Sequence, residues 1–308
     1  MNPALSLDRL TRRFGPVTAV EGLTLDVGYG ELFGIVGPDG AGKTTTLRML
    51  AGVLRPSEGD ALVAGVSVTA DPEGVKPHVA YMAQRFGLYE DLTVAENLDF
   101  YADLYRVPRR ERPARLERLY HFSNLGEFTD RLAGALSGGM KQKLSLSCAL
   151  IHRPRILLLD EPTFGVDPIS RRDLWLILHE MVAEGVTVVV STSYMDEAER
   201  CDRVVLLDRG RALALDRPRA LQEGLPGRLF HLRADQPRRA RDVLRSTPGV
   251  ESAVLFGETL HVLLAEGVEE DVIPASLESG GVKVLECGEG EPDLEDAFIR
   301  SVSDGGDA

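Results

Sequence analysis

Short, unbroken apolar runs recur along the first two thirds of the chain. Examples are LFGIV at 32–36, ILLL at 156–159 and GVTVVV at 185–190. Runs of this length, apolar at successive positions, are typical of strands buried on both faces of a parallel sheet. The first run is followed by TTLRML, a helix-forming stretch. This alternation of strand and helix predicts an α/β fold.

The last third of the chain has a different pattern. Four strand-like segments (RLFHLRA, SAVLFG, TLHVLLA and KVLECG) are interleaved with two helix-like segments, ARDVLRST and VEEDVIPASLESG. Their order, β-α-β-β-α-β, predicts a small ferredoxin-like domain over residues 226–300. It ends in a short acidic helix, EPDLEDAFIR. The final SVSDGGDA, 301–308, is expected to be a disordered tail, or a linker if further chain follows.

Charge supports a boundary between these two parts. The 308 residues carry a formal net charge of −13. From residue 228 onward there are 8 Lys/Arg against 17 Asp/Glu, so this segment contributes −9 of that total. The turn-forming GLPG at 224–227 lies at the shift, which predicts a first domain over 1–225. The strongly negative net charge also argues against a protein that binds the phosphates of nucleic acids.

The composition favours a cytoplasmic protein. No apolar run approaches the roughly 18 to 20 residues that a membrane helix needs, and the N-terminal MNPALSLDRL lacks the features of a signal peptide. The cysteines, Cys148, Cys201 and Cys287, are odd in number and far apart. We expect them to be free thiols in a reducing compartment.

The strongest chemical signal is GPDGAGKTT at 37–45, directly after the first apolar run. It fits the phosphate-binding pattern G-x-x-x-x-G-K-[ST] between a strand and a helix. Its glycines allow backbone N–H groups to turn toward phosphate oxygens, and the following helix adds its positive end. Lys43 can reach the outer phosphates, and the Thr44 hydroxyl is placed for Mg²⁺. The predicted nucleotide-binding residues of this loop are Gly37, Pro38, Asp39, Gly40, Ala41, Gly42, Lys43, Thr44 and Thr45.

A second signal is RILLLDEP at 155–162. The apolar run predicts a buried strand whose carboxyl end presents Asp160 and Glu161, with Pro162 closing the strand. An aspartate there can hold Mg²⁺ through water, and the adjacent glutamate can act as the general base for an attacking water.

The third signal is LSGGMKQKLSLSCAL at 136–150, where Ser137, Gly138 and Gly139 open an amphipathic helix and offer a hydroxyl and N–H groups to an anion. With it, residues 4 to about 222 resemble the ATP-binding subunits of ABC transporters. The resemblance implies a P-loop ATPase core with an antiparallel β edge and a helical subdomain at about 85–153. In that family the anion is the γ-phosphate of an ATP bound to the opposite subunit. The family signature usually ends in glutamine, and Met140 here resembles the variant of drug- and antibiotic-export members.

The resemblance assigns further positions. Phe14 matches an aromatic residue that stacks on adenine, although a core or turn phenylalanine is the simpler interpretation. Gln84 matches a glutamine that senses Mg²⁺ and the attacking water, and the segment 85–105 after it matches a region that touches the membrane partner. Asp167 matches a loop that crosses the dimer interface, where a simple turn aspartate is the alternative.

The stretch STSYMDE at 191–197 departs from the family. Ser193 stands where the family normally has a histidine that bonds the γ-phosphate. A serine hydroxyl can donate and accept, but it is shorter and needs a bridging water for the same contact. Loss of one such stabilising group typically costs about 10² to 10³ in rate. Either this chain has a weakened site and works beside a different, complete ATPase domain, or Ser193 suffices and two copies form a homodimer.

The resemblance implies an ATPase subunit of a membrane exporter, with ATP and Mg²⁺ as ligands. It would lie on the cytoplasmic face of the membrane beside a separate transmembrane permease. The acidic ending after the ATPase domain favours export over import. The alternative is a soluble ABC ATPase that acts on ribosomes or DNA. We find no coiled-coil insertion, zinc motif or second ATPase domain in this sequence, and the acidic charge also disfavours nucleic acid. The transported substrate is not encoded here.

Overall fold

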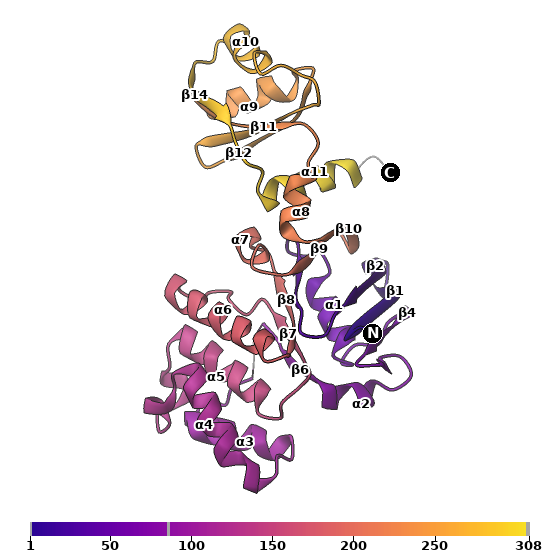
Figure 1. The fold of residues 1–308 in the computed structure, drawn as a ribbon, viewed down its shortest axis with the longest axis vertical. Helices are drawn as coiled ribbons and strands as arrows, with labels where there is room; N and C mark the ends of the chain where they lie inside the picture. The colour runs from indigo at the N-terminus through magenta and orange to yellow at the C-terminus, as the bar shows by residue number, and fades with distance from the viewer. Residues whose placement is uncertain (1, 85–86, 306–308) are drawn as a thin grey trace. The chain divides into compact units, whose positions relative to one another are not determined.

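The computed structural model describes residues 2–84 and 87–305 (Figure 1). Its contacts divide the chain into two compact units, one ending at Leu215 and the other starting at Asp216. This division falls earlier in the chain than the boundary that the charge shift predicts at 225. The reason is that α8 (Pro218–Glu223) packs against α11 (Leu294–Gly305), so it joins the second unit.

A mostly parallel sheet forms the centre of the first unit, in the order β10-β9-β3-β8-β7-β6. β3 is parallel to β8 and β9, and β7 is parallel to β8 and β6. Every residue of β3, β7 and β8 is buried, as the continuous apolar runs predict. The bounds are β3 (Leu32–Val36), β6 (Val79–Met82), β7 (Ile156–Asp160), β8 (Thr187–Thr192), β9 (Arg203–Asp208) and β10 (Arg211–Asp216).

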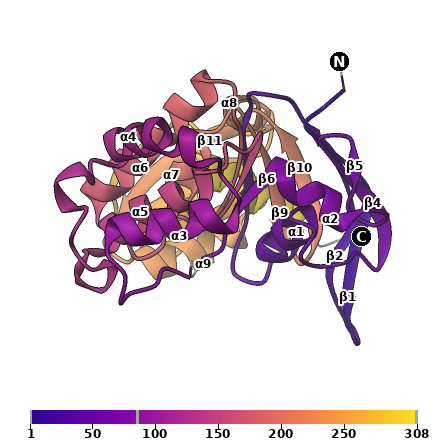
Figure 2. The same cartoon turned by 90° about the horizontal axis from the view of Figure 1, so that it is seen from below.

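An antiparallel sheet, in the order β2-β1-β4-β5, forms the expected β edge. Its buried side chains share one core with those of α1 and β7. Figure 1 shows α1 and this sheet on one side of β7 and β8, and α6 on the other, and Figure 2 shows α1 and α6 on opposite sides of β6. The bounds are β1 (Leu5–Phe14), β2 (Val17–Val27), β4 (Glu58–Val63), β5 (Val66–Ser67), α1 (Lys43–Leu50), α2 (Pro72–Val75), η1 (Lys76–His78), α6 (Pro168–Ala183) and α7 (Met195–Ala198).

Helices fill most of the segment between β6 and β7. α3 begins at a capping box in which Thr93 and Glu96 bond each other's backbone N–H groups. Leu98, Leu119 and Leu144 belong to a separate apolar core inside this helical group. Residues 85 and 86, where the sequence places the start of the helical subdomain, lie outside the described residues. The bounds are α3 (Val94–Leu104), η2 (Arg109–Glu111), α4 (Arg112–Ser123), η3 (Gly126–Phe128), η4 (Ala133–Ala135) and α5 (Gly138–Leu150).

Membrane-spanning helices were sought across residues 2–84 and 87–305. None of the helices there combines the length and the apolar character that crossing a membrane requires.

The second unit has the expected ferredoxin-like topology. Its strands pair antiparallel in the order β12-β13-β11-β14, and the chain passes through them as β-α-β-β-α-β. Leu232, Leu244 and Leu277 are fully buried in its core, to which the sheet, α9 and α10 all contribute side chains. The bounds are β11 (Arg228–Ala234), α9 (Pro237–Arg245), β12 (Val250–Phe256), β13 (Thr259–Leu264), α10 (Val272–Ser279) and β14 (Val284–Glu289).

The end of the chain differs from the sequence-based expectation. The sequence predicts a disordered tail from 301, whereas residues 301–305 continue α11. The hydroxyls of Ser301 and Ser303 donate to backbone carbonyls one turn back, and the preceding turns bury Leu294 and Ala297. Packing of the helix thus offsets the weak helix preference of its last residues. Residues 306–308 lie outside the described part of the chain.

A histidine on β13 anchors the first turn of α11. Asp293 and Asp296 bond each other's backbone N–H groups at the helix start, at 2.9 and 3.1 Å. The Nδ1 atom of His261 lies 2.9 Å from Oδ1 of Asp296. This hydrogen bond to a carboxylate raises the pKa of His261 above its ordinary value.

This pair predicts a pH dependence of the second unit. Because the folded-state pKa of His261 is raised, its contribution to stability is complete below the unfolded pKa of about 6.5 and disappears as pH rises through the folded pKa. We expect the protection of β11 and β13 amides from hydrogen exchange, corrected for intrinsic rates, to fall as the pH rises above about 6.5. His261→Gln should reduce this fall, whereas His179→Gln, at an exposed site on α6, should not. An equal fall in wild type and His261→Gln would contradict the assignment.

Candidate functional site

The loop between β3 and α1 needs glycine at two close approaches. Gly42 has φ of +105°, and a Cβ there would lie 2.5 Å from the carbonyl oxygen of Ala19. A Cβ on Gly37 would lie 2.2 Å from the carbonyl oxygen of Leu207. The backbones of the neighbouring strands therefore lie too close to the loop for a side chain at Gly37 or Gly42. A side chain at either position would displace the loop.

Lys43, the first residue of α1, is almost fully buried at 4% exposure. Its Nζ atom donates to the backbone oxygens of Gly37 (2.7 Å) and Pro38 (3.1 Å). It also forms an ion pair with Glu161 at 3.1 Å. The loop thus surrounds this ammonium group with carbonyl oxygens. A buried cation is stable only when hydrogen-bond acceptors and an opposite charge compensate for the loss of water.

Asp160 ends β7 and is buried, with 1% exposure. One carboxylate oxygen, Oδ1, accepts from the hydroxyls of Thr44 and Ser191, each at 2.9 Å. The other accepts from the Tyr81 hydroxyl at 3.2 Å. Burial, and next the Asp160 charge, raise the pKa of Tyr81 to about 12, so Tyr81 stays protonated and donates at neutral pH.

Glu161 is held in a left-handed backbone conformation, with φ of +48°. Its N–H donates to the Ser191 hydroxyl at 3.0 Å. Its carboxylate accepts from Gln84 Nε2 at 2.9 Å and pairs with Lys43. A non-glycine residue with positive φ is uncommon and costs about 1 to 3 kcal/mol, so surrounding contacts must maintain it.

Ser193 bridges the two main charged groups of the site. Its hydroxyl accepts from Lys43 Nζ at 2.8 Å and donates to Glu161 Oε1 at 3.3 Å. The serine is therefore in direct contact with both the lysine and the glutamate that the sequence analysis singles out.

Lys43 and Glu161 border a depression of about 470 Å³ at the start of α1. Phe14 is 46% exposed, and the Arg12 guanidinium lies 4.5 Å from its ring centre. The residues that line the depression are Phe14, Ala19, Asp39, Gly40, Ala41, Gly42, Lys43, Thr44, Thr45, Gln84 and Glu161.

The Ser-Gly-Gly segment lies elsewhere, beside Asp167. Ser137 caps α5 by accepting from the N–H of Met140 at 3.3 Å. A Cβ on Gly139 would lie 2.1 Å from the Ser170 hydroxyl. Asp167 caps α6 by accepting from the N–H groups of Ser170 and Ile169, and these bonds lower its pKa. Ser137, Gly138, Gly139 and Asp167 do not border the depression beside Lys43.

Sequence reasoning missed three residues of the site: Tyr81, Ser191 and Glu197. Ser191 has a signal, because the strand-ending STS places hydroxyls at the sheet edge. Glu197 has no such signal in the sequence, because it lies in an acidic stretch that is typical of an exposed surface. In the structure, however, its side chain is fully buried. Its Oε2 accepts from Thr163 (2.9 Å) and Thr192 (2.8 Å). Glu197 therefore ties the loop after Glu161 to the residue before Ser193.

Thr44, which lines the depression, and Asp160, which accepts the hydrogen bond of the Thr44 hydroxyl, supply hard oxygen ligands that suit a magnesium ion. In the second unit, ligand atoms of His261, Asp293 and Asp296 lie within 4.8 Å of one another. Their mutual hydrogen bonds already account for that cluster.

Residues 20–164 match the family described as ABC transporter. The chain is 44% identical over 307 residues to the probable multidrug ABC transporter ATP-binding protein YbhF of Escherichia coli (strain K12), covering 97% of this chain and 52% of that protein. It is 34% identical over 303 residues to the daunorubicin resistance ATP-binding protein DrrA2 of Streptomyces coeruleorubidus, covering 96% and 94%. A solved dimeric structure of the ATP-binding cassette MJ0796 in a post-hydrolysis state, bound to ADP and Pi, superposes with a TM-score of 0.63 at 25% identity, covering 69% and 98%.

The chain belongs to the ABC transporter family, and its first unit has the fold of that family's ATP-binding cassette. It spans about half the length of the YbhF proteins of Escherichia coli and Shigella flexneri that it matches.

The buried position of Glu197 predicts a large effect on stability. Glu197→Ala removes the acceptor of two buried hydroxyls and the partner of Arg171, 3.5 Å away. It should lower the free energy of unfolding of the first unit by about 3 to 5 kcal/mol. Urea unfolding followed by the fluorescence of Trp175, the sole tryptophan, measures this unit. Asp196→Ala, at the exposed neighbour, should change it by less than about 0.5 kcal/mol. Similar values for the two variants would contradict the assigned role of Glu197.

Proposed function

We propose that this chain binds and hydrolyses ATP with Mg²⁺ and powers a membrane exporter through ATP-driven closure of two ATPase domains. The observation that carries the proposal is the convergence of Lys43, Glu161 and Ser193 at the mouth of the glycine loop. A buried cation, a carboxylate and a hydroxyl meet there beside a depression large enough for the phosphates.

In this proposal the loop from Gly37 to Thr45 wraps the phosphates of ATP, and Lys43 exchanges its bond to Glu161 for a phosphate oxygen. Phe14 stacks on adenine, since its ring is half-exposed at the edge of the same depression. The Arg12 guanidinium already lies over that ring, an arrangement typical of an aromatic face that attracts a cationic or planar group.

Thr44 and Asp160 would hold Mg²⁺, with Gln84 nearby through its bond to Glu161. When bound, the ion neutralises developing charge on the phosphates. Ser191 and Tyr81 keep the Asp160 carboxylate oriented by donating to its two oxygens.

Glu161 would act as general base. It accepts a proton from a water molecule whose oxygen forms a bond to the γ-phosphorus, while the bond to the bridging oxygen of ADP breaks. Ser193 would position Glu161 and Lys43 rather than contact the γ-phosphate directly, because its hydroxyl is already within bonding distance of both. If the site is the weakened one, the lost contact to the γ-phosphate slows the reaction; if Ser193 suffices, positioning by its hydroxyl supports normal turnover.

A second ATPase domain would complete each site. Ser137, Gly138 and Gly139 lie at the N-terminus of α5, away from the depression of their own chain, which suits contact with an ATP on a partner. Asp167, adjacent to Gly139, would lie at the same interface. Relatives of similar length and of about twice the length both exist, so a homodimer and a pairing with a different domain remain the two forms of this proposal.

The exporter role rests on the relatives, which are named as multidrug, daunorubicin resistance and Nod factor export ATP-binding proteins. These names support transport rather than action on ribosomes or DNA. The proposal places the chain on the cytoplasmic face of the membrane beside a transmembrane permease, which would contact the segment that leads into α3. Nucleic acid is not expected as a partner, given the net charge of −13.

Steady-state ATP hydrolysis by the purified chain tests the catalytic assignments. Glu161→Gln should lower kcat by about 10² to 10⁴ because it removes the base, while ATP binding measured by calorimetry is retained. In the weakened-site form of the proposal, Ser193→His should raise kcat by up to about 10², because an imidazole reaches the γ-phosphate, whereas it should add nothing if Ser193 suffices. Asp196→Asn, on the exposed face of α7, serves as the control and should leave kcat unchanged.

The two forms of the proposal give different results in this assay. A slow wild type that gains rate with histidine indicates a weakened site and a different, complete partner domain. A wild type that turns over well and gains nothing indicates that Ser193 suffices, and a homodimer follows. Full hydrolysis by Glu161→Gln would refute the assignment of the base.

A further inference from the structure

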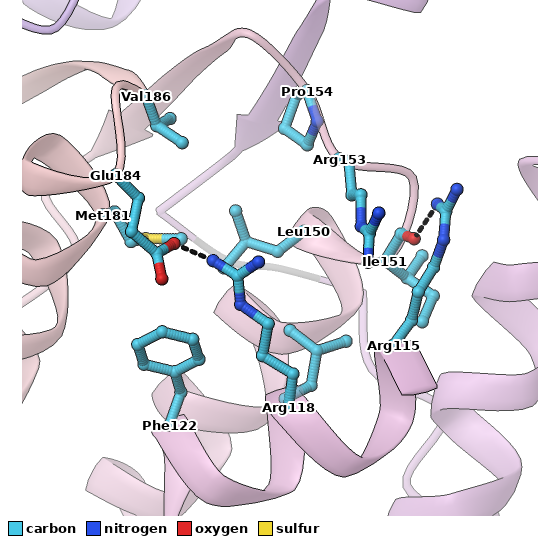
Figure 3. A pocket seen from close by; sticks show the side chains of 11 residues that line it. Arg115, Arg118, Phe122, Leu150, Ile151, Arg153, Pro154, Met181, Glu184 and Val186 are labelled. Atoms are coloured by element: carbon cyan, nitrogen blue, oxygen red, sulfur yellow. Dashed lines mark hydrogen bonds and ion pairs between the residues drawn. The ribbon is translucent and has the colours of Figure 1, made fainter. Parts of the chain in front are cut away.

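A second pocket, of about 460 Å³, lies in the first unit between α4, the C-terminal end of α5 and the C-terminal end of α6. Figure 3 shows the side chains around it. It shares no lining residue with the depression beside Lys43, so it is a separate site. Its volume falls within the range of small-molecule sites.

The body of the pocket is apolar. Leu119 on α4, Ile151 after α5 and Met181 on α6 are buried and form its inner wall, so three separate helices contribute. Phe122 and Leu150 are partly buried and extend this surface toward solvent. An aliphatic or aromatic group can therefore be covered on several sides, which favours a ligand with an apolar portion.

Positive charge gathers at the edge of this apolar surface. The lining includes Arg115, Arg118 and Arg153 but only one acid, Glu184. This excess is local, since the chain as a whole carries −13. The guanidinium group of Arg115 is already used in intramolecular hydrogen bonds, because it donates to the Ile151 carbonyl at 2.7 Å and to Glu111 at 2.6 Å.

The other two arginines are open to a ligand. Arg118 forms an ion pair with Glu184, and both side chains are more than 40% exposed, so this pair is weak and exchangeable. Within the described residues, the Arg153 side chain forms no hydrogen bond or ion pair, although its charge, after those of Arg115 and Arg110, helps to lower the pKa of Glu111. Figure 3 shows both guanidinium groups reaching over the apolar side chains from opposite sides of the pocket.

We propose that this pocket binds a small amphipathic anion, an aliphatic or aromatic group that carries a phosphate or carboxylate. The apolar portion lies against Leu119, Ile151 and Met181. The anionic group pairs with Arg153 and displaces Glu184 from Arg118, since guanidinium groups bind phosphate and carboxylate through paired hydrogen bonds. Neither a neutral apolar molecule nor a free phosphate satisfies both parts of the pocket.

Calorimetry with octyl phosphate, below its micelle concentration, tests this site on the whole chain. Octyl phosphate should bind at least about tenfold more tightly than octanol or inorganic phosphate, because each lacks one half of the ligand. Equal affinity for octyl phosphate and octanol would overturn the proposal. All titrations are made with the nucleotide site saturated with a non-hydrolysable ATP analogue, whose γ-phosphate fills the position beside Lys43, so that phosphate binding there does not contribute.

Substitutions then locate the binding. Arg153→Gln should weaken octyl phosphate binding about tenfold, and its fold should survive because the Arg153 side chain bonds to none of the residues that the structure describes. Glu184→Gln should strengthen binding, because it releases Arg118 from a competing carboxylate. Arg110→Gln, an exposed arginine outside the pocket, is the matched control and should change nothing. Unchanged affinity in both Arg153→Gln and Glu184→Gln would refute the site.

Vesicles of phosphatidylglycerol distinguish the two sources of such a ligand. Flotation of the chain with these vesicles, lost in Arg153→Gln, would assign the site to a membrane lipid. Octyl phosphate binding without flotation would assign it to a soluble amphiphile. Failure of octyl phosphate to bind a chain that still binds ATP would reject this pocket and leave the proposed ATPase function untouched.

Discussion

The ammonium group of Lys43 must be neutralised inside the protein, and the site is arranged around that need. Lys43 and Glu161 are only 4% and 13% exposed, so removing one partner of such a pair costs about 3 to 5 kcal/mol. The carbonyl oxygens of the glycine loop and the Ser193 hydroxyl complete the shell around the ammonium. The ammonium group of Lys43 therefore connects the glycine loop, the residues that follow β7 and β8, and the start of α1.

The same constraint connects nucleotide binding to hydrolysis in the proposed function. A phosphate oxygen that takes the place of Glu161 beside Lys43 leaves the carboxylate to Gln84 and Ser193, which already contact it. The carboxylate then becomes available as a base only after the phosphate has arrived. The positive φ of Glu161 fits a residue held in place by these neighbours rather than by its own preference.

The remainder of the chain consists of parts with their own cores. The helical group around Leu98 and the ferredoxin-like unit around Leu232 each bury a separate apolar cluster. Separate cores allow each part to keep its shape while its neighbours move, as closure of two ATPase domains requires. The pocket that Arg118 and Arg153 border lies within the first unit, where the helical group meets α6.

The sequence by itself determined what is local: the buried strands from their apolar runs, the glycine loop from its spacing, the acids at the end of β7, and the β-α-β-β-α-β order of the second unit. The tertiary structure decided what depends on strand order. Thr44, Asp160 and Ser191 meet because β8 lies between β3 and β7, a pairing that no local pattern specifies. Burial of Glu197 and extension of α11 to residue 305 likewise depend on packing between distant segments, which overrides local polarity and helix propensity.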